Sequence, residues 1–260
     1  MSSTPQALPG YAADVIAGAH VFALETDLEF VAQAINWAGG LHAYAARSSE
    51  AEKVQGRSTA FLIPAPDSGR WLVRHLTHGG LVSAITGDRF MRRGTPRPFN
   101  ELRLSVELRE LGVRTPEVPA AVVYPFGPFY RGDIARRWIG DARDLASCLF
   151  AEPDLSKRQR ADVLEAAGRL VRRLDDLGVG HPDLNARNIL IEWSDESPRA
   201  HVIDLEKCRI DPQLPGWKRR RMFKRLTGSL YKFQNLTGRP LTGAERDILR
   251  LTYADGPGEP

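Results

Sequence analysis

The sequence predicts an α+β fold with two lobes, a small β-rich N-terminal lobe that contains one helix and a larger, mostly helical C-terminal lobe. Three observations lead to this prediction. β-Rich runs prevail up to about residue 139, helical periodicity prevails after it, and one strong helical pattern interrupts the strands near residue 100. With 260 residues the chain is long enough for two lobes and a sizeable core. We therefore expect the lobes at residues 1–139 and 140–260.

The first part of the N-terminal lobe gives weak signals. Residues 1–18 are small and include prolines, so we expect them to be loosely held. Asp27–Trp37 fits a short helix, Tyr44–Lys53 fits an extended segment, and Thr59–Ile63 is a β-rich run.

The turn at residues 55–58 joins two extended runs and has the outline of a loop that covers nucleotide phosphates. It offers Gly56 and Ser58 as candidate ATP contacts. Because it lacks the full G-x-G-x-x-G pattern, an ordinary hairpin explains it equally well.

A strand and a helix then supply one cation and one carboxylate. The strand Trp71–Arg74 ends on Arg74. Pro96 and Pro98 then precede a helix with a leucine-rich face that runs to about Leu111 and is closed by Gly112. Glu101 lies on that apolar face, where a carboxylate needs a partner. We favour an ion pair with Arg74 over the alternative, a first-turn glutamate stabilised by the helix dipole.

The change from strands to helices follows. Val118–Tyr124 and Phe129–Ile139 are two expected strands, and Asp141–Phe150 is an expected helix. We place the hinge between the lobes at residues 139–141, where an adenine ring would meet backbone amide and carbonyl groups. Ser156 and Gln159 then form a capping box for a long helix that Gly178 ends.

The stretch His181–Ile191, HPDLNARNILI, is a polar loop that runs into a β-branched strand, and a second strand ends on Asp204. The spacing is that of a kinase catalytic loop, H-R-D-x-x-x-x-N, with a metal-binding Asp about twenty residues later. Asp and Asn also favour ordinary turns. All of them at this spacing, between two short hydrophobic strands, favour phosphoryl transfer instead.

Each residue of this set has a chemical role in such a transfer. Asp183 would orient the acceptor hydroxyl, and His181 would orient the loop. Asn188 and Asp204 would bind Mg²⁺ beside the triphosphate of ATP, because magnesium prefers hard oxygen ligands and keeps several waters.

The composition bounds the location of the protein. Its 42% hydrophobic and 26% charged residues are those of an ordinary soluble protein. Cys148 and Cys208 show no metal or redox spacing, which favours a reducing cytosol. The opening residues lack a secretory signal, and no apolar run has the length of a membrane span. We expect a cytoplasmic protein, with contact to a membrane surface left open.

The positive charge is concentrated in one segment. There is no acidic residue between Asp211 and Glu245, yet eight Lys and Arg residues lie there, against 28 basic and 32 acidic residues elsewhere. Residues 218–232 also read as an amphipathic helix. We expect its apolar stripe to pack in the core and its cations to meet an anionic membrane surface. No groove-reading motif accompanies the charge, so no nucleic acid is expected as a partner.

Several blocks together resemble the bacterial lipopolysaccharide kinase family, and within it the 3-deoxy-D-manno-octulosonic acid (Kdo) kinases. The resemblance covers about Trp71 to Lys232. It rests on the blocks WLVRHLTHGGL, RPFNELRLSVELRELGVRTPEVPAA, FYRGDI, HPDLNARNILI and HVIDLEK.

This resemblance implies an ATP- and Mg²⁺-dependent kinase of protein-kinase-like fold that acts on the cytoplasmic face of the inner membrane as a peripheral protein. The acceptor would be a hydroxyl, the 4-hydroxyl in that family, of the Kdo sugar on a lipid A precursor. By position, Asp183 matches the catalytic Asp, Asn188 and Asp204 the metal ligands, Glu101 the helix glutamate, and Arg74 an arginine where protein kinases have lysine.

Some positions depart from the family pattern. Thr77-His78 precedes the double glycine where more basic residues are expected, Pro182 follows His181, and Asp204-Leu205-Glu206 replaces Asp-Phe-Asp. Arg187 and Asn185 are candidate substrate contacts. Arg187 is a candidate anchor for the acceptor's carboxylate, and a loop-stabilising arginine is the equal alternative.

Two other readings remain. A phosphotransferase for a soluble alcohol, such as an aminoglycoside or choline, shows the same loop, but its cleft is usually acidic, whereas this chain is basic. A pseudokinase that only binds a partner usually lacks one of the three polar residues that this chain keeps, namely Asp183, Asn188 and Asp204.

Overall fold

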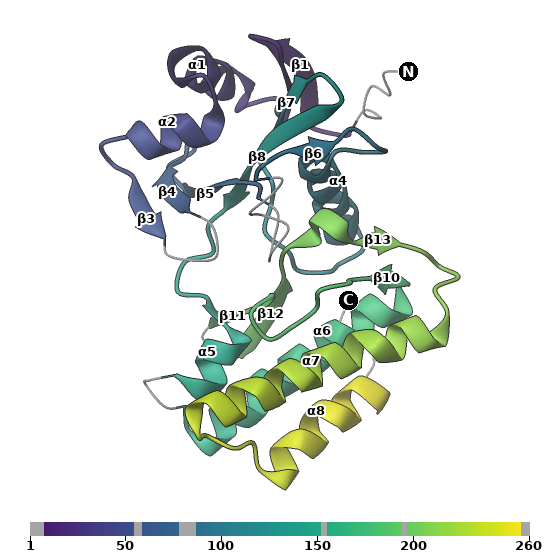
Figure 1. Ribbon diagram of the computed structural model, residues 1–260. Helices are drawn as coiled ribbons and strands as arrows, with labels where there is room; N and C mark the ends of the chain where they lie inside the picture. Colours follow the sequence, from purple (N-terminus) through teal and green to yellow (C-terminus); the bar gives the residue numbers. More distant parts are fainter. Residues whose placement is uncertain (1–7, 55–58, 78–86, 152–154, 194–196, 256–260) are drawn as a thin grey trace. The chain divides into compact units, whose positions relative to one another are not determined.

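The computed structural model describes residues 8–54, 59–77, 87–151, 155–193 and 197–255 (Figure 1). It divides into two compact units, of which the first comprises residues 1–106 and 117–138. The second comprises residues 107–116 and 139–260. One division therefore falls at the expected place after the last long strand, and the short segment 107–116 belongs to the second unit.

The first unit is built on an eight-stranded sheet in which all the described pairings are antiparallel. The strands follow the order β1-β2-β7-β8-β5-β4-β3, and β6 pairs with β8. Their bounds are β1 Tyr11–Ile16, β2 Ala19–Leu24, β3 Glu52–Val54, β4 Ala60–Pro64, β5 Arg70–His75, β6 Phe90–Met91, β7 Ala120–Phe126 and β8 Phe129–Arg137.

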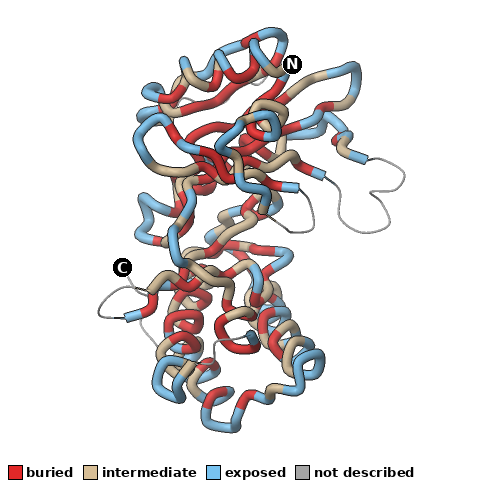
Figure 2. Tube along the Cα trace, turned by 90° about the vertical axis from the view of Figure 1, so that its left-hand side faces the viewer, coloured by how far each residue is buried: buried red, intermediate tan, exposed pale blue. Residues whose placement is uncertain are grey.

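Helices cover both faces of this sheet. On one face, α1 (Leu28–Ala38) and α2 (Leu41–Arg47) pack on Trp71 and Val73 of β5. On the other, α4 (Arg97–Glu110) packs on residues that include Ile134 of β8. Successive strand residues alternate between these two cores, as a two-sided sheet requires. In Figure 2 the buried stretches of this unit lie toward its interior and the exposed stretches lie on its outside.

Two expectations for the start of the chain need correction. Residues 11–16 are not loosely held but form β1, joined to β2 by Ala17 and Gly18, both with positive φ. Of the expected extended segment Tyr44–Lys53, Glu52 and Lys53 are in strand β3, but Tyr44–Arg47 belongs to helix α2. Its first N–H groups are capped from distant residues: Leu41 N donates to Tyr124 Oη (2.9 Å) and His42 N to Asp133 Oδ2 (2.8 Å). Such caps cannot be read from local sequence.

The second unit contains two small sheets, β12-β11-β9 and β10-β13, and four α-helices in its described part. Its strands are β9 Arg143–Asp144, β10 Val179–Gly180, β11 Ile189–Trp193, β12 Pro198–Val202 and β13 Arg209–Ile210. Its helices are α5 Leu145–Phe150, α6 Lys157–Asp176, α7 Gly216–Thr237 and α8 Gly243–Asp255, with a 3₁₀ turn, η2, at Leu205–Lys207.

Local signals explain several of these helices. The capping box of Ser156 and Gln159 is confirmed at the start of α6. The helix expected from residue 141 begins only at Leu145, because Arg143–Asp144 pairs with β11. The Asp144 side chain caps this helix by accepting a hydrogen bond from the Ser147 N–H. The apolar stripe expected in the core on α7 is buried at Met222, Leu226 and Leu230 and half-buried at Phe223 and Phe233.

Helix α8 had no counterpart among the predicted elements. It packs along α6, where a Cβ on Gly168 would lie 2.9 Å from the Thr252 Cβ (Figure 1). Arg160 of α6 and Glu245 of α8 form an ion pair at 2.5 Å. Across the residues that the structure describes, none of the helices combines the length and hydropathy that a membrane span requires.

Candidate active site

The predicted catalytic loop connects β10 to β11 and is tied to the strand end that carries Asp204. His181 is buried, and its Nε2 lies 3.0 Å from the carbonyl oxygen of Ile203. The backbone N–H of Ile203 donates to the carbonyl of Asn188 at 3.0 Å. The residue immediately before Asp204 is therefore fixed to both ends of the loop, at one end through the side chain of His181.

Inside the loop, the carbonyl oxygen of Asp183 accepts hydrogen bonds from two side-chain amides. Asn185 Nδ2 donates at 2.7 Å and Asn188 Nδ2 at 2.9 Å, while Asn185 Oδ1 accepts from the Arg187 N–H at 2.9 Å. Both polar atoms of Asn185 thus shape the loop, which favours a structural role over the expected substrate contact. The amide of Asn188 is oriented so that its Oδ1 is the atom available to a metal ion.

Two helices hold the middle of the loop. The Ala186 N–H donates to Ser229 Oγ of α7 at 2.9 Å, and the Ala186 carbonyl accepts from Ala146 N–H of α5 at 3.2 Å. Arg187 points its guanidinium at the ring of Phe233, with 5.1 Å from Cζ to the centroid. This cation–π contact to α7 supports the loop-stabilising alternative for Arg187.

The carboxylate of Asp183 faces two cations that sequence reasoning missed. Its side chain is 50% exposed, with Lys207 Nζ at 3.4 Å from Oδ2 and Arg225 Nη1 at 3.6 Å from Oδ1. Lys207 follows the Asp204-Leu205-Glu206 motif, and Arg225 belongs to the basic segment of α7. The motif and the charge run were both visible in the sequence, but nothing in their spacing indicated that they converge on Asp183.

Asp204 adopts a left-handed backbone conformation with φ of 67° at the start of η2. For a residue other than glycine this conformation is uncommon and costs about 1–2 kcal/mol, and such strain concentrates at functional sites. Asp204 offers a carboxylate and Asn188 an amide oxygen, the hard donors that Mg²⁺ prefers.

The described residues contain no cluster of three or more His, Cys, Asp or Glu able to hold a metal. A magnesium ion bound together with a triphosphate does not need such a cluster, because phosphate oxygens and water complete its coordination. The donor set of Asn188 and Asp204 therefore fits the expected ion.

In the first unit, the expected ion pair between Glu101 and Arg74 is wrong. Glu101 is buried and pairs with Arg136 of β8, whose Nε lies 2.6 Å from Oε1, and both side chains are under a tenth exposed. In the register of β5 and β8, Leu72 is opposite Arg136 and Arg74 is opposite Ile134, so both arginines project from the same face of the sheet.

Glu101 therefore has the partner that its burial requires. This partner lies on β8, a strand that the sequence did not connect with the site. Its second oxygen, Oε2, is buried and accepts no hydrogen bond from the described residues. Gly56 and Ser58, the candidate phosphate contacts, lie outside the described residues, as does His78 of the Thr77-His78 turn.

The strand that carries Arg74 is anchored by a charged network at its next residue. His75 Nδ1 lies 2.6 Å from Asp133 Oδ1 and its Nε2 lies 3.1 Å from Asp88. Asp133 Oδ2 also accepts from Tyr124 Oη at 2.8 Å. Burial alone would lower the pKa of His75, but the hydrogen bonds and negative charges of Asp133 and Asp88 outweigh it and raise that pKa above its ordinary 6.5.

Comparisons with known proteins match this chain to one family over most of its length. Residues 42–254 match the model of the lipopolysaccharide kinase (Kdo/WaaP) family. A protein named 3-deoxy-D-manno-octulosonic acid kinase from Stenotrophomonas maltophilia is 33% identical over 201 residues, covering 76% of each chain. One of the same name from Vibrio cholerae is 32% identical over 179 residues, covering 68% of this chain and 72% of the relative.

Among solved structures, a chain described as WaaP in complex with acyl carrier protein is similar with a TM-score of 0.54 and 18% identity. The similarity covers 82% of this chain and 80% of that one. At this identity the likeness concerns the fold, and it confirms the expected two-lobed, protein-kinase-like fold. The match over residues 42–254 and the identity to these kinases show that the chain belongs to the lipopolysaccharide kinase (Kdo/WaaP) family.

Proposed function

We propose that the protein is an ATP-dependent kinase that phosphorylates a hydroxyl, the 4-hydroxyl, of the Kdo sugar on a lipid A precursor. The observation that carries the proposal is the loop in which the Asn188 side chain donates to the Asp183 carbonyl, while the Asn188 carbonyl accepts from the backbone N–H of Ile203, the residue before Asp204. Relatives named 3-deoxy-D-manno-octulosonic acid kinase support the choice of acceptor.

In this reaction the Asp183 carboxylate accepts a hydrogen bond from the acceptor hydroxyl and orients its oxygen toward the γ-phosphorus of ATP. It takes the proton as the new O–P bond forms and the bond to the ADP oxygen breaks. Lys207 and Arg225 hold this carboxylate in place from two sides. His181 keeps the loop at a fixed position relative to Asp204.

The nucleotide is bound by further groups of this chain. Asn188 Oδ1 and Asp204 would hold Mg²⁺, which when bound neutralises negative charge on the phosphate oxygens. Arg74 would bind phosphate oxygens with its guanidinium, and the buried pair of Glu101 and Arg136 supports the same face of the sheet. Gly56 and Ser58 remain candidate phosphate contacts.

The site of action that we propose is the cytoplasmic face of the inner membrane, with the protein bound peripherally. Residues 218–232 of α7 would meet the anionic surface. Arg220, Lys224 and Lys232 of this segment are exposed and have the charge that such a contact requires.

The test is transfer of labelled γ-phosphate from Mg-ATP by the purified protein to a Kdo-bearing lipid A precursor, with the precursor that lacks Kdo alongside. We expect label only on the Kdo-bearing lipid, and mass spectrometry of the product then locates the phosphorylated hydroxyl. Label on neither lipid, from protein that still binds Mg-ATP, would contradict the proposed acceptor. Label on an aminoglycoside or choline would instead favour the soluble-alcohol alternative.

A further inference from the structure

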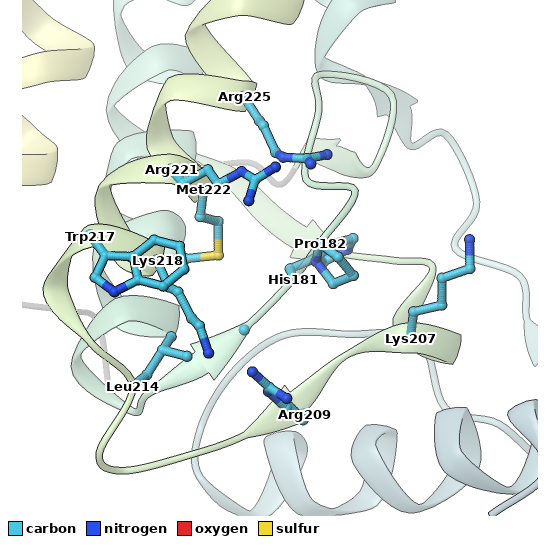
Figure 3. A pocket seen from close by; sticks show the side chains of 11 residues that line it. His181, Pro182, Lys207, Arg209, Leu214, Trp217, Lys218, Arg221, Met222 and Arg225 are labelled. Carbon is cyan, nitrogen blue, oxygen red and sulfur yellow. The ribbon is translucent and has the colours of Figure 1, made fainter. Parts of the chain in front are cut away.

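A pocket of 330 Å³ lies in the second unit beside the catalytic loop. Figure 3 shows its lining: His181 and Pro182 from the loop, Lys207 and Arg209 around β13, and several residues from the first turns of α7. All of these belong to one compact unit, so the pocket is a feature of that unit alone. It begins one residue before Asp183, which places it next to the candidate catalytic carboxylate.

The lining of this pocket is strongly cationic. Of the described residues that form it, none is acidic, and five carry a positive charge: Lys207, Arg209, Lys218, Arg221 and Arg225. Lys207 and Arg225 make ion pairs with Asp183. For the other three, no carboxylate lies within ion-pair distance among the described residues. Their charges converge on a hollow space rather than on a partner within the described chain.

The position of these cations on α7 is unfavourable for the helix itself. Lys218 and Arg221 lie in the first two turns of α7, and its first turn contains no acidic residue. The positive end of the helix dipole disfavours cations there, most strongly at Lys218 in the first turn. An anion bound in the pocket would reverse the sign of this effect, because it would interact favourably with both the side chains and the dipole.

The remaining lining suits an organic ligand better than a bare ion. Trp217 is 56% exposed, and Lys218 Nζ lies 5.4 Å from the centroid of its ring. Pro182, Leu214 and Met222 add apolar surface. A volume of 330 Å³ is far larger than a single ion needs and falls within the range of small-ligand sites.

We propose that this pocket binds the sugar acid that accepts the phosphoryl group. Arg209, Lys218 and Arg221 hold its carboxylate, and Trp217 forms a wall against its ring. The acceptor hydroxyl then extends past Pro182 to Asp183. This inference rests on the proposed function, and it assigns carboxylate recognition to these residues instead of to Arg187, which packs on Phe233 and does not line the pocket.

The test is steady-state kinetics of Arg209→Gln, Lys218→Gln and Arg221→Gln with detergent-dispersed, Kdo-bearing lipid acceptor. A matched control is Arg158→Gln, an exposed cation of α6 whose side chain is 92% exposed. Each pocket variant should raise the acceptor KM about tenfold or more, because it removes a charge-assisted hydrogen bond to the carboxylate. The KM for ATP should stay unchanged, and the control should match the wild type.

A second acceptor in which the carboxylate is converted to a carboxamide identifies the group that is bound. On this acceptor the KM of the wild type should rise by about the factor that the variants show on the natural acceptor. The KM of the variants should rise little further. If the variants raise KM relative to wild type by the same factor on both acceptors, the carboxylate assignment is overturned. If the effect of the variants on KM disappears on a lipid that lacks its phosphates, the bound group is a lipid phosphate instead. If the variants raise KM only with vesicles and not in detergent, these cations bind the membrane surface, and the pocket assignment is overturned.

Failure of the proposed function is distinguishable from failure of this inference. If the wild type transfers no phosphate, free Kdo is titrated while tryptophan fluorescence is recorded for the wild type and for Trp217→Phe. A saturable change that the Trp217→Phe variant lacks and that Arg221→Gln weakens would support the pocket without any turnover. No Kdo-dependent change would overturn the inference.

Discussion

At the scale of single residues, a small number of contacts fix the position and direction of the Asp183 carboxylate. Its backbone carbonyl is held by Asn185 and Asn188, and its carboxylate lies between Lys207 and Arg225. The backbone contacts set its position and the two cations set its direction. Removing the carboxylate should therefore affect the reaction without disturbing the loop.

Asp183→Ala should lower kcat about a hundredfold or more, in line with typical contributions of general acid–base groups, while ATP affinity stays nearly intact. The measurement is turnover with saturating substrates, together with ATP binding by calorimetry. A variant with a wild-type kcat would show that Asp183 does not have the assigned role.

Single residues also show what sequence can and cannot predict about the site. Asp183, Asn188 and Asp204 can be proposed from the sequence because their spacing is a local property of one loop and the strand after it. Arg136 and Lys207 were missed because their roles depend on the pairing of β8 with β5 and on the path of η2. The same limit explains why Glu101 was given the wrong arginine.

At the scale of elements, the two-stranded sheet β10-β13 connects the long helix α6 to the catalytic loop. Gly178 ends α6 with φ of 68°, and its carbonyl accepts a hydrogen bond from Asp211 N–H at 2.9 Å. A Cβ at Gly178 would collide with the backbone carbonyl of Asp211. The sequence predicted this glycine as a helix end, but not the close approach of the second chain segment.

Gly178→Ala should destabilise the protein by several kcal/mol, because a backbone clash adds to the roughly 1–2 kcal/mol of a left-handed alanine. The control is Gly228→Ala within α7, where the added methyl meets nothing within 4 Å. That change should stabilise the helix by about 0.5–1 kcal/mol. Thermal unfolding midpoints of the two variants should therefore move in opposite directions, and a shared direction would contradict this account.

A second element-scale feature is the network at the end of β5. The raised pKa of His75 means that its charged form stabilises the folded state fully below the ordinary value of 6.5 and loses this effect as pH rises through the higher folded pKa. Burial would raise the pKa of Asp88, but its bond to His75 and the charge of Arg131 lower it. Its contribution is therefore present above its ordinary 3.8 and is lost on acidification through the lower folded pKa.

His75→Gln keeps a hydrogen-bonding side chain but cannot be protonated. The stability difference between wild type and this variant should be largest between the two ordinary values, 3.8 and 6.5, and should shrink as pH rises past the folded pKa of His75. Urea unfolding of both proteins across this range measures it. A difference that grows toward alkaline pH would have the wrong sign for this network.

The elements that sequence predicted well are those with local start and stop signals, such as α6 with its capping box and the β7–β8 hairpin. Helix α2 was predicted as extended because Tyr124 and Asp133, which cap it, lie more than eighty residues away in sequence. Helix α8 was not predicted, although it closes the core of the second unit against α6.

At the scale of the whole molecule, the fold class and the family were predictable because the catalytic loop and its flanking blocks span most of the chain. The charge distribution was predictable too, but not which basic residues contact other groups of the chain, which line the pocket and which are left for a membrane surface. Arg219 is tied to Leu214 O at 3.0 Å and lies 3.9 Å from Asp175, and Arg221 lines the pocket. Only part of the basic segment remains for a membrane surface.

Replacing the exposed cations Arg220, Lys224 and Lys232 by glutamine should weaken binding to anionic vesicles by very roughly 1 kcal/mol per charge, so about a hundredfold for the three. The same number of charges removed at Lys157, Arg158 and Arg250 provides the control. Vesicle co-sedimentation at two salt concentrations measures the effect. If vesicle binding changes neither with the salt concentration nor with these substitutions, the segment has a purely structural role.

The β1–β2 hairpin has a consequence for the edge of the sheet in the first unit. It lies at residues 11–24, before the family match begins at residue 42, and β2 pairs with β7. Without it, the largely apolar β7 would present unpaired backbone groups along an open edge, a template for intermolecular pairing and aggregation. With it, the outer described strand is β1, whose exposed stretch carries the charge of Asp14. A fragment cut to the family boundaries would keep every candidate catalytic group and lose this protection.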